Sequence, residues 1–120
     1  MSYATKNCIA DAVQLVPFEI WSVMLDDKTI RFFEPLIIKP RILDRGTPAE
    51  CFCAECAELD LFAVGVDLDE LLSCLRSDIR MTWKRVVQKH TNALTADERR
   101  VKQRWLNIAE VINDGGGSDG

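Results

Sequence analysis

The chain has 120 residues, of which 48% are hydrophobic and 28% charged, and this composition is typical of one globular domain. It excludes collagen-like, mucin-like and wholly disordered proteins. No apolar run approaches the roughly 18 residues of a membrane-spanning helix, and residues 1–16 do not resemble a secretory signal peptide. The sequence therefore predicts a cytoplasmic protein without a membrane segment, whose five cysteines are reduced thiols.

Charge is distributed unevenly along the chain, whose formal net charge is −4. Residues 1–75 hold 6 basic and 13 acidic residues, whereas residues 76–104 hold 9 basic and 3 acidic residues. An acidic chain is a poor non-specific binder of nucleic acid, but a basic stretch within it can contact RNA or an acidic protein. The competing interpretation is a solvated helix face whose charges pair with Asp78, Asp97 and Glu98.

The first predicted elements are a helix and a hairpin. Residues 5–16 place apolar side chains three and four positions apart, which predicts a helix that ends at Pro17. Two β-rich runs, residues 19–25 and 29–33, flank a polar turn at residues 26–28 and predict a hairpin.

Three further strands are predicted in the centre of the chain. The run over residues 35–43 is rich in β-branched residues but is interrupted by Pro40, which predicts an edge strand or a bulge. A turn signal at residues 44–48 follows. Residues 49–56 and 59–66 then predict two more strands joined by a short turn.

A long helix is predicted over residues 68–89. Asp67 is a favourable N-cap, and Glu70 lies three residues later, as in a capping box. Residues spaced by three or four positions form one apolar stripe: Leu68, Leu72, Leu75, Ile79, Trp83 and Val86.

A second helix is predicted over residues 95–112, because Thr95 and Glu98 form another capping box. Its apolar stripe consists of Val101, Trp105, Ile108 and Ile112. The glycine-rich residues 113–120 are expected to end the helix and to form a disordered tail.

These elements predict an α+β fold in which a small antiparallel sheet packs against the long helix and the second, C-terminal helix. We expect one domain over residues 1–112. It would consist of an N-terminal extension (1–34), a β-β-β-α core (36–89) and the C-terminal helix (95–112).

Residues 55–79 read ECAELDLFAVGVDLDELLSCLRSDI, which resembles the signature of the HicB-like family of antitoxin-related proteins. Cys56, Glu58 and Leu59 match that family's Cys-Pro-Glu-Leu element, with Ala57 in place of the proline. Asp67 replaces the usual threonine cap. The resemblance covers residues 36–88, about the extent of the predicted core, and implies a partial RNase H or dsRBD-like fold.

The resemblance also implies a role in protein–protein association. Many members neutralise a small ribonuclease toxin and self-associate, and many carry a C-terminal DNA-binding module. After Gln88 only one further helix fits in this sequence, which is too little for such a module. Operator binding is therefore not part of the expectation.

Cysteines and carboxylates suggest metal chemistry, but their placement argues against it. In a strand, Cys51 and Cys53 point to one face and Cys56 to the other, so the three thiols do not converge on one zinc ion. A two-magnesium nuclease needs converging carboxylates, and the acidic residues here are neighbours in sequence: Glu55, Glu58, Asp60, Asp67, Asp69 and Glu70. His90 is a lone histidine near a predicted helix end.

The sequence thus assigns no catalytic, cofactor or metal residue and predicts a non-enzymatic protein-interaction module. The expected partner is a small basic toxin-like protein or a second copy, docked where Pro40 interrupts a sheet edge. One alternative is a nucleic-acid-binding module, and another is a metal-dependent nuclease. The candidate partner-binding residues lie in the basic stretch: Arg76, Arg80, Lys84, Arg85, Arg99, Arg100 and Arg104.

Overall fold

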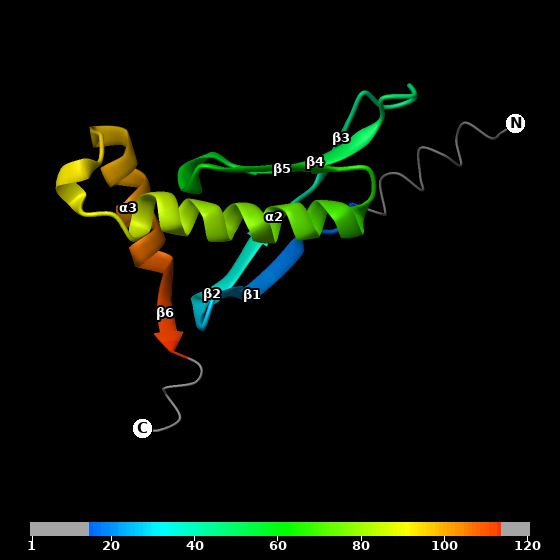
Figure 1. Cartoon of the computed structure of the whole chain (residues 1–120). Coiled ribbons are helices and arrows are strands. Elements are labelled where there is room, and N and C mark those ends of the chain that lie inside the picture. The colour runs from blue at the N-terminus through cyan, green and yellow to red at the C-terminus, as the bar shows by residue number, and fades with distance from the viewer. Residues whose placement is uncertain (1–14, 114–120) are drawn as a thin grey trace, which may run out of the picture.

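The strands form two antiparallel sheets of three strands each in the computed structural model, which describes residues 15–113. The first sheet has the strand order β1-β2-β6 and contains β1 (Phe18–Leu25), β2 (Lys28–Ile38) and β6 (Ala109–Asn113). The second has the order β3-β4-β5 and contains β3 (Arg41–Leu43), β4 (Cys51–Cys56) and β5 (Leu61–Gly65). In the view of Figure 1, the β3-β4-β5 sheet lies above the long helix α2, and the β1–β2 hairpin crosses behind α2 and emerges below it.

The helices are α2 (Leu68–Thr82), which continues as a π-helical segment (Trp83–Val87), and α3 (Ala96–Ile108). Short 3₁₀ turns occupy Ala57–Leu59 and Thr91–Ala93. The predicted α+β class is confirmed, and no helix within residues 15–113 is long and apolar enough to cross a membrane.

Two sequence expectations fall mainly outside the described residues. The helix expected over residues 5–16 overlaps them only at Leu15 and Val16, which have no regular structure. The tail expected over residues 113–120 overlaps them only at Asn113, which belongs to β6.

The predicted hairpin is confirmed by β1 and β2, which pair from Leu25 opposite Lys28 outward. Asp26 in the turn has φ +54, a left-handed conformation that aspartate tolerates better than most residues.

The predicted run over residues 35–43 is divided between the two sheets. Its first part belongs to β2 of the first sheet, beyond Phe32, where the pairing of β2 with β6 has ended, and its second part, after Pro40, is β3, an edge strand of the second sheet. Pro35, which has no N–H to donate, lies in the part of β2 that β6 does not pair with. It is tolerated because the register shifts there. Ile20 faces Leu36 and Ser22 faces Arg31, so four residues of β2 bulge opposite Trp21.

The start of α2 is fixed against β5 by close backbone approach and by capping. A Cβ atom on Gly65 would lie 2.4 Å from the Leu71 backbone nitrogen, so only glycine fits there. The Asp67 carboxylate accepts a hydrogen bond from the Glu70 N–H (2.8 Å), as predicted for the N-cap. The Glu70 carboxylate accepts from the Val66 N–H (2.8 Å), one residue before the cap.

Both sheets and both helices contribute to one hydrophobic cluster, with Trp105 of α3 among its fully buried members. The Trp105 indole N–H donates to the Leu59 carbonyl oxygen (3.1 Å). Its ring meets Trp83 edge-on, with centroids 5.8 Å apart, and lies 6.0 Å from Phe32. Trp105 therefore links α3 to the helical run, to the β1–β2 hairpin and to the turn between β4 and β5.

The second helix is shorter than the sequence predicted: it ends at Ile108, and residues 109–113 form β6 instead of a last helical turn. The capping box of Thr95 and Glu98 at its start is confirmed. The Trp105–Ile108–Ile112 spacing fits a helix, but Ala109 is extended and β6 pairs with β2 from Ala109 opposite Phe32. Pairing with the free edge of β2 overrides the local helical pattern.

Candidate functional site

The predicted basic residues are largely engaged within the fold, beginning with those on α2. The Arg76 guanidinium donates to the Ser22 carbonyl oxygen of β1 (2.9 Å). Farther along the helical run, the Lys84 ammonium forms an ion pair with Asp26 in the β1–β2 turn (3.1 Å). Both side chains thus hold the helical run against the first hairpin.

Two further arginines pair with acidic residues in the β4–β5 turn. Arg85 forms an ion pair with Asp60 (2.8 Å), and Arg104 of α3 forms one with Glu58 (3.2 Å). These exposed pairs neutralise two of the carboxylates that a nuclease would need. The two ion pairs link the β4–β5 hairpin to the helical run and to α3.

The remaining three predicted basic residues differ in whether they have a partner. Arg99 donates to the Leu94 carbonyl oxygen (3.0 Å), and Arg100 pairs with Asp97. Arg80 is half-buried, and its guanidinium makes no ion pair or hydrogen bond with residues 15–113. The seven residues therefore do not form one open basic surface.

The other candidate groups remain separate. Within residues 15–113, no three His, Cys, Asp or Glu side chains converge as a metal site would require. Cys53 is buried and Cys51 and Cys56 are half-buried, all as free thiols on β4. Glu55 forms an ion pair with Arg41 (3.2 Å).

The acids and the histidine near the helices serve local structure. The Asp78 carboxylate accepts from the Phe62 N–H (2.9 Å) at the outer edge of β5, and Glu98 belongs to the capping box of α3. His90 is exposed, and its backbone carbonyl accepts from the Ala93 N–H (2.9 Å).

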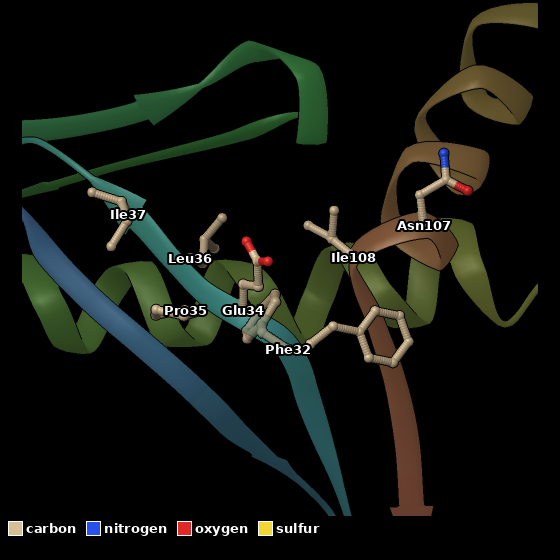
Figure 2. Close-up of a pocket in the computed structure, with 8 residues that line it drawn as sticks. Phe32, Glu34, Pro35, Leu36, Ile37, Asn107 and Ile108 are labelled. Atoms are coloured by element: carbon tan, nitrogen blue, oxygen red, sulfur yellow. The ribbon is translucent and has the colours of Figure 1, made fainter.

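A groove that the sequence analysis did not identify lies at the bulge of β2, beside the end of α3 (Figure 2). Pairing of β2 with β6 stops at Phe32, so the next residues of β2 have no neighbouring strand on that side. The groove has a volume of about 320 Å³. Its lining residues are Phe32, Phe33, Glu34, Pro35, Leu36, Ile37, Asn107 and Ile108.

Glu34 is the one ionisable residue among those lining residues. Figure 2 shows its carboxylate pointing into the groove, with Leu36 on one side and Ile108 on the other. This side chain is exposed and makes no ion pair or hydrogen bond with any residue from 15 to 113. The Asn107 side-chain oxygen is occupied, because it accepts from Gln103 (3.1 Å).

The groove continues onto the outer face of the β1-β2-β6 sheet, which we call the open face. Its large apolar side chains are Trp21, Met24, Phe33, Ile37 and Ile112, with exposed fractions of 59%, 57%, 54%, 53% and 36%. A second hollow of about 610 Å³ on this face shares Phe32 and Phe33 with the groove. The opposite face of the sheet is buried in the core, with Val23, Leu25 and Ile30.

A sequence signal for the open face exists in β1. An antiparallel strand with one solvated face alternates apolar and polar residues. The β1 sequence, FEIWSVML, instead carries large apolar residues at both alternations: Ile20 and Met24 at one, and Trp21, Val23 and Leu25 at the other. The register shifts between Ile20 and Ser22, and in the folded strand Ile20, Val23 and Leu25 are buried whereas Trp21 and Met24 are exposed.

Comparison of the chain with protein-family models, with curated proteins and with solved structures found no match.

Proposed function

We propose that this protein is a non-enzymatic protein-interaction module that binds a protein partner on the open face of the β1-β2-β6 sheet. The observation that carries this proposal is the set of exposed apolar side chains on that face, with Trp21 and Phe33 more than half exposed. Contiguous exposed apolar surface marks sites of association. Aromatic residues are also enriched at the centres of protein interfaces.

The alternatives have less support from the geometry. Nucleic-acid binding by the basic helices would compete with the ion pairs that Lys84, Arg85 and Arg104 make with acidic turns. A nuclease would need carboxylates that converge, whereas Glu58 and Asp60 each pair with a separate arginine. An antitoxin-like role, as the HicB-like resemblance implies, is the form of this function that we propose.

Affinity capture from the native cells tests the proposal. The wild-type chain is compared with a variant carrying Trp21→Ser and Phe33→Ser, and each complex is sized by light scattering. Val66→Ser with Met81→Ser is the matched control, because these residues are 72% and 62% exposed but lie outside the open face. Circular dichroism verifies that each variant is folded.

We expect the wild type and the control to form a complex of fixed stoichiometry that the open-face variant loses. Retention of the complex by the open-face variant would contradict the proposal. Recovery of nucleic acid instead of protein, with binding that weakens steeply as salt is raised, would favour the basic helices.

A further inference from the structure

We propose that the groove at the β2 bulge receives a basic side chain of the bound partner, lysine or arginine, with Glu34 as its counter-ion. This inference rests on the proposed function, because it specifies the chemistry of a partner that covers the open face. The expected partner therefore presents a lysine or arginine side chain that is flanked by apolar residues.

The first step is the state of Glu34 before binding. Its side chain is exposed, so water can solvate the carboxylate, which makes no ion pair or hydrogen bond within residues 15–113. Other carboxylates near the helices are already neutralised, for example Asp60 by Arg85 and Glu58 by Arg104. Glu34 therefore has no counter-charge among residues 15–113, and the other residues that line its groove are uncharged.

The second step is what binding does to that charge. A partner that packs on Phe33 and Ile37 removes water from the groove between them, because both residues line it. Burying an ionised carboxylate without a counter-charge is strongly unfavourable, whereas a paired and hydrogen-bonded carboxylate is tolerated. A purely apolar partner is thus penalised, and an acidic one is repelled.

The third step is the fit of a basic side chain. Lysine and arginine carry three or four methylene groups below the charged head, and these pack on apolar surface while the head reaches a polar atom. The groove provides such walls in Pro35, Leu36 and Ile108, with the Glu34 carboxylate pointing between the last two. Its volume of about 320 Å³ suits one side chain rather than a folded element.

The inference is tested without the partner by titrating isotope-labelled protein with n-butylguanidinium, an analogue of the arginine side chain. The neutral isostere n-butylurea is titrated in parallel, and amide chemical shifts of Leu36, Asn107 and Ile108 are followed by NMR. Glu34→Gln removes the charge and keeps the shape. Asp44→Asn is the matched control, because this aspartate is exposed and lies in the β3–β4 turn, outside the groove.

We expect saturable shifts with n-butylguanidinium that weaken about five-fold in Glu34→Gln, as for the loss of one exposed ion pair, and that Asp44→Asn preserves. Equal binding of n-butylurea, or equal binding by Glu34→Gln, would overturn the inference. With a captured partner, Glu34→Gln should weaken the complex about ten-fold or more, because that charge pair is desolvated.

The two proposals fail in different ways. If a complex forms through the open face but Glu34→Gln binds as tightly as wild type, the basic side chain is refuted while the interaction function stands. If n-butylguanidinium binds as expected but the open-face variant keeps its partner, the docking function is refuted while the groove's preference for a cation stands.

Discussion

The basic residues of the helical segments and Glu34 at the β2 bulge differ in whether their charges have partners within the fold. On the helices, Lys84, Arg85 and Arg104 each pair with an acid from a hairpin turn. At the bulge, Glu34 lies among apolar side chains and pairs with nothing in residues 15–113. The more highly charged region is therefore the less available one, because most of its charged side chains have a partner within the fold.

The comparison shows that charge density in a sequence does not by itself locate a binding surface. Arginines that contact backbone carbonyls or turn carboxylates act as links between elements, as Arg76 does between α2 and β1. A single acid becomes informative when its surroundings are apolar and it lacks a partner. The following predictions test this distinction, from the largest expected effect to the smallest.

The largest effect is expected at Trp105, which connects the two regions. Replacing it with alanine removes a fully buried ring and its hydrogen bond to Leu59. We expect Trp105→Ala to lower the free energy of unfolding by about 3–5 kcal/mol, measured by urea denaturation. Leu106→Ala, at a neighbouring exposed position, should change it by less than about 0.5 kcal/mol. Similar values for the two variants would show that α3 does not anchor both regions.

Gly65 tests how closely α2 is held against β5. In Gly65→Ala the new methyl group would meet the Leu71 backbone at 2.4 Å, so the helix must move. The expected destabilisation is about 1–3 kcal/mol. Gly46→Ala is the comparison, because a Cβ there meets nothing within 4 Å and only its φ of +82° is unfavourable. A smaller effect at Gly65 than at Gly46 would refute the close approach.

Thr95 tests the local signal that begins α3. Thr95→Ala removes the acceptor for the Glu98 N–H (3.1 Å) and should cost about 1 kcal/mol of stability. Thr95→Ser keeps a hydroxyl in place and should restore most of the loss. The measurement is thermal or urea unfolding of both variants, and equal losses would show that the capping hydroxyl is unimportant.

The smallest effect is expected from the paired charges themselves. A double-mutant cycle on Arg104 and Glu58, each changed to alanine, should give a coupling free energy of about 0.2–1 kcal/mol that decreases with added salt.

Glu34→Gln should leave the free energy of unfolding unchanged within about 0.5 kcal/mol, since its side chain has no partner to lose among the described residues. A large stability loss in Glu34→Gln would remove the contrast between the two regions.

Much of the fold was predictable where the deciding interactions are local. The caps of α2 and α3 follow from Asp67 and Thr95, each of which bonds to a backbone N–H three residues later. The β1–β2 hairpin follows from a short polar turn between β-rich runs, and the extended helical run that ends at Val87 follows from its apolar stripe. In these cases neighbouring residues in the sequence are also neighbours in space.

The candidate site was not predictable in this way, because it depends on contacts between distant segments. Residues 109–112 have a helical spacing, and only the free edge of β2, paired through Arg31 opposite Glu110, makes them a strand. The end of that pairing, together with the bulge opposite Trp21, opens the groove around Glu34.

The sequence by itself determined the α+β class, the helix starts and the hairpins, because capping, turn and periodicity signals act over a few residues. Only the tertiary structure decided that Lys84, Arg85 and Arg104 are neutralised, and that Trp21 and Phe33 stand on an open face. Both outcomes depend on which side chains meet across the fold. Periodicity assigns a residue to one face of an element, and packing then decides whether that face is covered.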